Sequence, residues 1–512
     1  MENTNEIKKE ESNNQNTMGI SKKSYWPTYL IIAILMFSFL VRLGFFIDTK
    51  DQTVWWDEAE YLMKAKHFAS GTSDEGWNPL RELLMSIFWA FLYKFGATEL
   101  VIRISSYIFS LLAIYLTYLV GKELFSKKIG LIAAFLMAIY NQNIFFTYRM
   151  LIDIPATVFW LLSIYFFWKG YVKEKNNKYL YLSGISIGFG FLMHYSLLFL
   201  VLILIMFMFF TDKLKFLKNK NIWITLAIIL IIISPYIIWS LINYKTPLPR
   251  YSAAFVASQT GIYTPSSWNA YIKYIPLHLQ SILLTLFIIG FIILLINIIL
   301  SFDLILKNKD KSASNQLLVL LWFLIPLSIY TYASIESSGW SEPRYLLLLL
   351  PPISFIIALC LEKIHTFLNP KSKIVSIISV VAILLIGAVF QIRAADQLIQ
   401  SKIGVPAVKD AGLYIKSNTN KEDTVMINSM QMELAYYSER RIIGFPSNES
   451  EMKDKIKFNN VKFTLINGLY RAADWTYSYP ENNKDFFEPV EIYFLDDEKT
   501  QPAIVIYKVK QI

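Results

Sequence analysis

Cysteine, histidine and charge are all scarce in this sequence. Cys360 is the single cysteine, so no disulfide bond can form within the chain. The four histidines are scattered, and no Cys or His pair has the spacing of zinc ligands, so a zinc site is not predicted. Charged residues make up 17% of the chain, below the roughly 25% of soluble domains. These scarcities argue against a disulfide scaffold, a zinc protein and an ordinary soluble enzyme.

Apolar residues are abundant and gather in long runs. Hydrophobic residues account for 55% of the chain and aromatic residues for 16%. Apolar runs long enough for membrane spans predict a polytopic α-helical membrane protein with about eleven transmembrane helices. The predicted spans are 25–46, 100–121, 129–147, 155–171, 179–192, 196–211, 222–241, 277–300, 316–332, 344–362 and 374–392. The polar segment 1–24 has no small-residue cleavage site, so we expect a disordered cytoplasmic tail before an uncleaved first span.

The positive charges follow the predicted topology. A net charge of +10 would suggest nucleic-acid binding in a soluble protein, but most Lys and Arg residues lie in short loops between spans. Loops 122–128, 169–178, 212–220, 303–313 and 362–373, on one side of the membrane, hold 17 of them. Loops 146–154, 193–195, 242–276 and 333–343, on the other side, hold 4. Because positive loops face the cytoplasm, this predicts a cytoplasmic N-terminus, an extracytoplasmic C-terminus, contact with membrane lipid and no nucleic-acid partner.

One further apolar stretch, 79–95, is predicted to lie on the membrane surface instead of crossing it. Its uncharged core, Leu83 to Tyr93, is too short for a span, and counting it as one would invert the charge distribution downstream. We therefore expect an amphipathic helix within a long first outer loop, 49–99. The same loop is predicted to contain a second juxtamembrane helix at 57–69.

The acidic pair Asp57-Glu58 follows two tryptophans in this outer loop. A carboxylate near the lipid headgroups can take a proton from an attacking hydroxyl, whereas an acid inside hydrocarbon would have to be neutralised. The plainer interpretation is a helix that starts with acidic residues, which the helix dipole favours. On the same predicted side lies Asp153, which either caps the helix that contains Pro155 or joins Asp57 around one cavity.

After residue 393 the composition becomes that of a soluble α/β domain. Alternating patterns predict strands at 424–428, 440–445, 461–466, 490–495 and 503–508, and helices near 406–417, 431–438 and 448–456. The predicted organisation is thus a tail at 1–24, a membrane domain at 25–393 and an extracytoplasmic domain at 394–512. This last domain could recognise an acceptor or act as a structural cap. The outer loop 242–276 could close over a cavity or simply carry interfacial aromatic residues.

Several segments together resemble the GT-C class of integral-membrane glycosyltransferases, in the branch of protein O-mannosyltransferases and lipid A aminoarabinose transferases. The resemblance covers roughly 50–400. It depends on the order of the matching segments, which are Asp57 to Tyr61, Asn78-Pro79-Leu80, Arg103-Ile104-Ser105-Ser106, Asp153, Gly184 to Tyr195, and Glu342 to Leu346. Two positions depart from the usual pattern: Ser105 stands where Pro is common, and His194 stands where the family has Lys.

The resemblance implies a polytopic GT-C fold and a transferase that uses a polyprenyl-phosphate-linked sugar. Asp57 would deprotonate an acceptor hydroxyl, and attack opposite the phosphate would invert the anomeric carbon. Glu58 would orient Asp57 or the acceptor, or would bind a divalent ion. The leaving phosphate needs cationic partners, for which Arg344 is the first candidate, ahead of Arg149 and His194. Arg344 could instead snorkel to the membrane interface.

The remaining expectations are less specific. Tyr61 and Tyr345 belong to the matching segments, and Arg103 is expected to be the buried partner of an acid. No resident cofactor is required, although Mg²⁺ or Mn²⁺ would need only Asp57, Glu58 or Asp153 plus the donor phosphate. The acceptor could be a protein, a glycolipid or a polysaccharide. A polyprenyl-linked sugar or lipid transporter and a non-catalytic assembly scaffold are the alternative functions; a transporter would more naturally show inverted repeats, and none is found.

Overall fold

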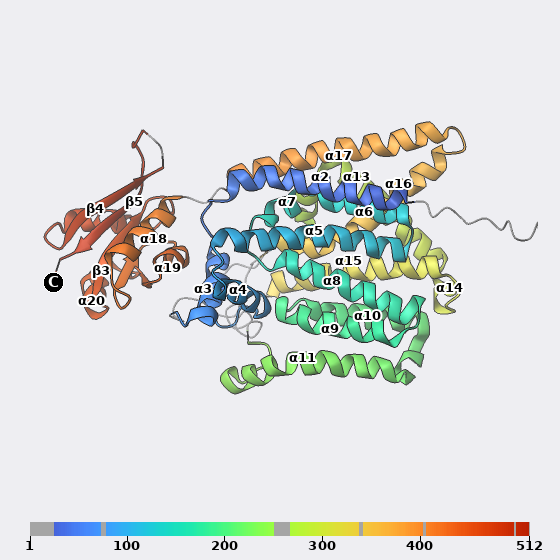
Figure 1. Ribbon diagram of the computed structural model, residues 1–512, viewed down its shortest axis with the longest axis horizontal. Coiled ribbons are helices and arrows are strands. Elements are labelled where there is room, and N and C mark those ends of the chain that lie inside the picture. Colours follow the sequence, from blue (N-terminus) through green and yellow to red (C-terminus); the bar gives the residue numbers. More distant parts are fainter. Residues whose placement is uncertain are drawn as a thin grey trace, which may run out of the picture.

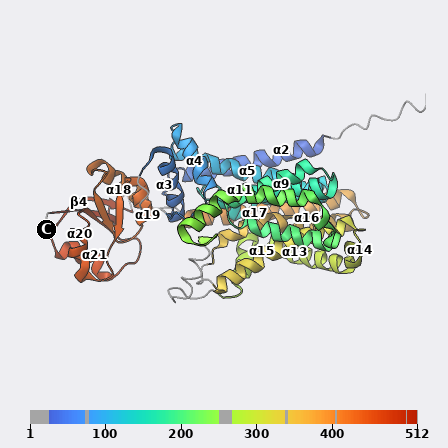
Figure 2. The ribbon, with the colours of Figure 1, turned by 90° about the horizontal axis from the view of Figure 1, so that it is seen from below.

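The protein consists of a helical bundle and a smaller domain at one end of it. The computed structural model describes residues 25–72, 78–249, 267–336, 341–402, 406–495 and 498–510. The predicted tail 1–24 and most of the predicted closing loop lie outside the described residues. Figure 1 and the perpendicular view in Figure 2 place the C-terminal domain beyond the same end of the bundle.

The bundle confirms a polytopic α-helical membrane protein. Its long elements are α2 (Trp26–Thr49), α5 (Glu99–Leu124), α6 (Lys127–Ile139), α7 (Asn141–Thr147), α8 (Asp153–Phe167) continued by η1 (Trp168–Lys173), α9 (Asn177–Met193), α10 (Leu197–Asp212) continued by η2 (Lys213–Lys218), α11 (Lys220–Tyr244), α13 (Ala270–Leu300), α15 (Lys311–Glu336), η3 (Pro343–Leu349) with α16 (Leu350–Leu368), and α17 (Lys373–Ser401). A short helix, α14 (Phe302–Leu306), joins α13 to α15.

The number of spans differs from the predicted eleven. Among the described residues, eight helices are long and apolar enough to cross a membrane, or nine if the bent pair α6 and α7 forms one span. The other two predicted positions are occupied by α8 with η1 and by α9, which is 17 residues long. Both helices fall outside that count because they are short. The predicted positions of these two spans are therefore correct, but the helices are shorter than a full-length span.

The helices differ in how much protein surrounds them. The most apolar windows of α2, α11 and α17 are each 22% buried, whereas that of η3 with α16 is 83% buried. Exposed apolar side chains on the outer helices are expected where lipid is the solvent. The segment that starts with η3 is therefore the centre of the bundle, and charged residues at its start point into protein.

Helices α5 and α6 pack with backbone against backbone. A Cβ atom added to Gly121 would lie 2.8 Å from the Gly130 Cα atom, and one added to Gly130 would lie 2.6 Å from the Tyr118 carbonyl oxygen. Close approach through small residues is the usual way in which helices associate in membranes. The pair thus needs glycine at both positions.

Two of the spans are broken, and side-chain amides compensate for the break. Helices α6 and α7 meet at 60°, and α13 is kinked at Gln280, which has a φ of 55°. Gln391 of α17 donates to the freed carbonyls of His278 (3.0 Å) and Leu279 (2.7 Å) and accepts from the backbone N–H of Asn141 (2.9 Å). A break inside a membrane is tolerated because such side chains satisfy the backbone.

Both predicted juxtamembrane helices are present as α3 (Trp56–Ser70) and α4 (Leu84–Lys94). Figure 1 shows them at the end of the bundle that carries the C-terminal domain, whereas α14, in one of the lysine-rich connections, lies at the opposite end. Helix α2 begins at that opposite end and leads to α3. The acidic loop and the lysine-rich loops are therefore on opposite ends of the bundle.

The C-terminal domain is a five-stranded mixed sheet with helices, as predicted. The strand order is β2-β1-β3-β5-β4; β1 is parallel to β2 and β3, and β5 is antiparallel to β3 and β4. The elements are α18 (Pro406–Asn418), β1 (Thr424–Ile427), α19 (Gln431–Ser438), β2 (Arg441–Gly444), η4 (Glu449–Glu451), α20 (Met452–Phe458), β3 (Val461–Asn467), α21 (Asp474–Asn482), β4 (Phe487–Phe494) and β5 (Pro502–Val509). Helix α21 was not predicted, and α17 extends to Ser401, beyond the predicted boundary at 393.

Candidate active site

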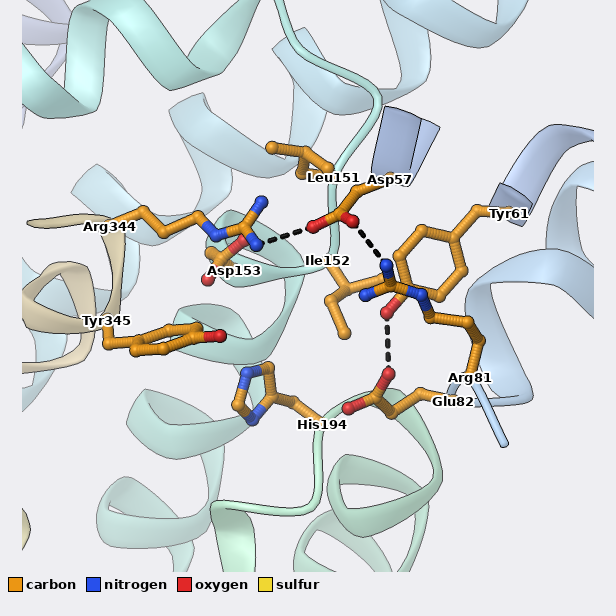
Figure 3. A pocket seen from close by; sticks show the side chains of 10 residues that line it. All are labelled: Asp57, Tyr61, Arg81, Glu82, Leu151, Ile152, Asp153, His194, Arg344 and Tyr345. Atoms are coloured by element: carbon orange, nitrogen blue, oxygen red, sulfur yellow. Dashed lines mark hydrogen bonds and ion pairs between the residues drawn. The ribbon is translucent and has the colours of Figure 1, made fainter. Parts of the chain in front are cut away.

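A small cavity of about 20 Å³ lies where the start of α3 meets the bundle (Figure 3). Side chains from five separate parts of the chain surround it. Its lining residues are Asp57 and Tyr61 of α3, Arg81 and Glu82 before α4, Leu151, Ile152 and Asp153 at the start of α8, His194 after α9, and Arg344 and Tyr345 of η3. The cavity therefore brings together the charged residues Asp57 and Arg344, which are 287 residues apart in the sequence.

Asp57 is held between two guanidinium groups. Its Oδ2 atom accepts a hydrogen bond from Arg344 Nη2 at 2.5 Å, and its Oδ1 atom accepts one from Arg81. Arg81 also forms an ion pair with Glu60, one helical turn further along α3. Burial raises the pKa of the Glu60 carboxyl above its ordinary value, while Arg81 acts in the opposite direction.

The orientation of Asp57 follows from the way in which α3 begins. Trp55 has an extended backbone, and its N–H donates to Glu58 Oε2 at 2.6 Å, which is the reach-back half of a capping box. Asp57 occupies the first turn, where the helix dipole favours a negative charge. Successive residues in a helix point about 100° apart, so Asp57 and Glu58 face different surroundings.

Glu58 is directed away from the cavity and is completely buried. Its Oε1 atom accepts from the backbone N–H of Met150 at 2.6 Å, and its Oε2 atom lies 3.3 Å from Arg149 Nη1. Met150 immediately precedes Leu151 and Ile152, which line the cavity. The carboxylate of Glu58 therefore ties the start of α3 to one wall of the cavity.

Asp153 opens α8 and lines the cavity, together with Arg344. Its carboxylate is buried, and Arg344 and His194 lie close enough to act on it electrostatically. Figure 3 shows the imidazole of His194 and the ring of Tyr345 on the side of the cavity away from Asp57. The structure thus brings Asp57, Asp153, His194 and Arg344 into one cavity, as the sequence predicts for residues on one side of the membrane.

Arg149 and Arg103, two other predicted site residues, lie outside the cavity. The guanidinium of Arg149 stacks over the Trp55 ring at 3.7 Å and donates to the carbonyl of Thr53 at 3.3 Å. Arg103 pairs with Glu99 at 2.8 Å. Arg149 is thus separated from the two arginines that reach Asp57, and its predicted phosphate contact gains no support from this geometry.

Arg81 and Glu82 line the cavity but were not predicted as site residues. In the sequence they only mark the charged start of a short apolar segment. Glu82 Oε2 accepts a hydrogen bond from the Tyr61 hydroxyl at 2.5 Å, and Lys64 donates to the Arg81 carbonyl at 2.6 Å. The sequence gives little sign of this contact. The two charged residues before α4 and the acids of α3 come together only because the chain turns back between the two helices.

Among the residues that the structure describes, no group of three or more His, Cys, Asp or Glu residues is arranged to hold a metal ion. Of the predicted carboxylates, Asp57 and Asp153 face the cavity, whereas Glu58 is occupied by backbone N–H groups. A Mg²⁺ or Mn²⁺ ion would therefore need the donor phosphate as a ligand beside Asp57 and Asp153, and it stays a prediction.

Comparison with known proteins identifies the class. Residues 83–239 match the family of dolichyl-phosphate-mannose-protein mannosyltransferases. The structure is similar to ArnT from Cupriavidus metallidurans bound to undecaprenyl phosphate, with a TM-score of 0.63, 11% identity, and coverage of 94% of this chain and 98% of that one. The chain has the GT-C glycosyltransferase fold.

A second GT-C relative is structurally similar over a large part of the chain. The oligosaccharyltransferase AglB from Archaeoglobus fulgidus, in complex with an inhibitory peptide and a dolichol-phosphate, has a TM-score of 0.60 and 15% identity and covers 87% of this chain and 70% of that one. No curated protein sequence matches the chain. The predicted resemblance to GT-C glycosyltransferases is confirmed by the fold.

Proposed function

We propose that this protein transfers a sugar from a polyprenyl-phosphate carrier to an acceptor hydroxyl, with inversion at the anomeric carbon. The observation that carries the proposal is the cavity in which Asp57 meets Arg344 and Asp153 beside the two juxtamembrane helices. A lipid-linked donor is also supported by the family that matches residues 83–239 and by the polyprenyl phosphates bound in the two structural relatives.

The donor phosphate is proposed to bind Arg344, with Arg81 beside it. Both guanidinium groups line the cavity, and a planar guanidinium can contact two phosphate oxygens at once. In the structure both arginines contact Asp57. An incoming phosphate would therefore compete with the Asp57 carboxylate for them, and Asp57 would become available as the donor binds.

Asp57 is proposed to act as the general base. It takes the proton of the acceptor hydroxyl while that oxygen attacks the anomeric carbon from the face opposite the phosphate. The bond between the anomeric carbon and the phosphate oxygen breaks, and the electron pair leaves with the polyprenyl phosphate. Arg344 neutralises the charge that develops on this leaving oxygen.

The other predicted residues are proposed to position substrates or the base. Asp153 and His194 lie on the cavity wall, where they can hydrogen-bond sugar hydroxyls or the phosphate. Glu58 and Arg149 are assigned to holding the start of α3, because their contacts run to the backbone of Met150 and Thr53. Tyr61 and Tyr345 complete the wall.

The reaction is proposed to occur on the extracytoplasmic face of the cell membrane. The lysine-rich connections lie at the end of the bundle opposite the cavity, which by the positive-inside rule is the cytoplasmic end. A polyprenyl tail could then remain in the lipid while the phosphate and sugar enter the cavity. The acceptor would be a protein, a glycolipid or a polysaccharide exposed on that face.

The test is mass spectrometry of lipid-linked sugars and surface glycans from cells that lack the gene. Deletion cells are complemented with wild type, Asp57→Asn or Asp51→Asn at matched expression. Asp51 is an exposed acid in the same loop and serves as the control. We expect Asp57→Asn, like the deletion, to accumulate one polyprenyl-phosphate sugar and to lose one glycan residue, whose mass identifies the sugar. A wild-type profile from Asp57→Asn would refute the general base and favour transport or scaffolding.

A further inference from the structure

The C-terminal domain contacts the helix that carries Asp57 directly. Helix α19 packs across α3 and reaches α4, although 383 residues separate Val54 from Tyr437 in the chain. We propose that α19 is a positioning element that fixes the start of α3, and that Tyr437 is its main positioning residue. The inference rests on the proposed function for its activity readout and assigns a role to the C-terminal domain in that reaction.

Tyr437 contacts the backbone just before α3. Its hydroxyl accepts a hydrogen bond from the Val54 N–H at 3.1 Å, and both residues are buried. Behind it, a Cβ atom added to Gly412 of α18 would lie 2.5 Å from the Tyr437 Cβ atom. The backbone of α18 thus packs directly against the part of α19 from which the Tyr437 side chain starts.

The hydroxyl of Tyr437 completes a series of three contacts on consecutive residues. The carbonyl of Gln52 accepts from Arg103 at 2.6 Å, and the carbonyl of Thr53 accepts from Arg149 at 3.3 Å. Both arginines belong to the membrane bundle. The third contact, on Val54, comes from the C-terminal domain, so the segment that aims Asp57 is fixed partly by each domain.

A second attachment lies near the other end of α3. Lys66 Nζ is 2.9 Å from Glu439 Oε1 and 4.2 Å from the centre of the Tyr436 ring. The hydroxyl of Tyr436 is in turn 3.3 Å from the hydroxyl of Tyr93 on α4. Because α19 is attached near both ends of α3, it can set the tilt of the helix as well as the place where it begins.

A third contact concerns charge. Glu433 of α19 is buried, and Asp57 and Glu58 act on its carboxyl electrostatically. Its Oε2 atom has no hydrogen-bond partner within the part of the chain that the structure describes. The first turn of α19 thus lies close enough to the base for the charge of one domain to affect the other.

The experiment uses full-length protein in lipid nanodiscs. Tyr437→Phe removes only the hydroxyl that contacts Val54. Tyr507→Phe is the matched control, because its hydroxyl donates to Glu481 at 2.9 Å inside the C-terminal domain. Hydrogen exchange of residues 52–66 reports on the start of α3. Transfer rates are measured with lipid extract and membranes of cells lacking the gene, which supply unused donor and unmodified acceptor.

We expect Tyr437→Phe to speed exchange at 52–66 and to lower kcat about tenfold, while KM changes less than about threefold, since small misplacements of a catalytic group slow the chemical step. Tyr507→Phe should change neither quantity. Faster exchange with an unchanged kcat, or unchanged exchange, would overturn the inference. If wild type transfers no sugar, the proposed function fails, while the exchange data still test whether α19 holds α3.

Lys66→Met supplies a second variant with its own control. Glu439 pairs with Lys66 of α3 and, at 2.8 Å, with Lys416 of α18. Lys66→Met removes the contact between domains, whereas Lys416→Met removes the contact within one domain from the same carboxylate. Only Lys66→Met should lower kcat and speed exchange near the end of α3. Equal effects of the two would mean that the carboxylate matters for folding of the domain and not for the position of α3.

Discussion

Arg344 and Asp57 form an ion pair of 2.5 Å between Nη2 and Oδ2 across 287 residues of sequence. Arg344 stands at the start of the most buried span, and Asp57 stands at the start of a helix outside the spans. The cavity therefore cannot exist until the first outer loop has docked on the assembled bundle. Its chemistry depends on how these two distant segments are held together.

Replacing Arg344 should slow transfer without preventing donor synthesis. We expect Arg344→Gln to lower the transfer rate about 100-fold or more, because a charge partner for the leaving phosphate is worth roughly 3 kcal/mol. Arg344→Lys should recover only part of the loss, since an ammonium cannot make the two-point contact. Rates in nanodiscs measure this, with the exposed Arg393→Gln as the control. A rate for Arg344→Gln close to that of wild type would exclude the phosphate role.

The neighbouring acids Asp57 and Glu58 should give different phenotypes. Asp57→Asn is expected to abolish transfer, because it removes the proposed base, and also to lower stability, because Arg81 and Arg344 lose a buried partner. Glu58→Gln should lower stability by on the order of 3 kcal/mol, since it leaves Arg149 buried without its anionic partner, but it should keep measurable transfer. Thermal unfolding in detergent measures the stability of both variants, and transfer rates in nanodiscs measure their activity. Complete loss of transfer in a Glu58→Gln variant of wild-type stability would contradict the assignment of Glu58 to positioning.

Glu433 should make stability depend on pH. Burial, followed by weaker repulsion from Glu58 and Asp57, raises the pKa of Glu433 from its ordinary 4.5 to about 7. The folded protein therefore keeps a proton that the unfolded chain releases between these pH values, so this group's contribution to stability falls as pH rises from 4.5 to 7 and is level above 7.

Glu433→Gln removes this titration with little change in shape. We expect the variant to match wild type near pH 4.5 and to gain up to about 3 kcal/mol at pH 8, where wild type carries the buried charge. Melting temperatures across pH 4.5 to 8 test the sign. A variant that loses stability at pH 8 would show that the charged carboxylate is favourable at this interface.

The glycine contact between α5 and α6 gives a prediction for the membrane core. Gly121→Ala should cost about 1–3 kcal/mol, because its Cβ would lie 2.8 Å from Gly130 and 2.9 Å from the Phe355 ring. Gly44→Ala is the matched control in α2, since a Cβ there meets no atom of the described residues within 4 Å. It should be neutral or slightly stabilising, as alanine favours a helix. Melting temperatures of the pair measure the difference, and equal values would argue against tight packing at Gly121.

Composition and charge were sufficient to predict the helical bundle and the C-terminal sheet domain. The length of an apolar run and the alternation of apolar and polar residues in a strand can both be recognised locally in the sequence. They could not give the number of full-length spans, since α8 and α9 are short and the break of α13 depends on an amide from α17, far along the chain. That Asp57, Asp153 and Arg344 lie around one cavity was predictable, because all three are on the same predicted side of the membrane. The place of Arg81 was not predictable, because its role depends on the packing of α4 against α3.

The capping of α3 makes the first outer loop intolerant of a change in register. Trp55 fixes where the helix begins, and from there Asp57 faces the cavity while Glu58 faces Met150. Inserting or deleting one residue between the cap and the acids would turn them by about 100° about the helix axis. Loop-length variation should thus be confined to the connection between α3 and α4, and alignments that place a gap within Trp55 to Glu58 would pair unlike acids.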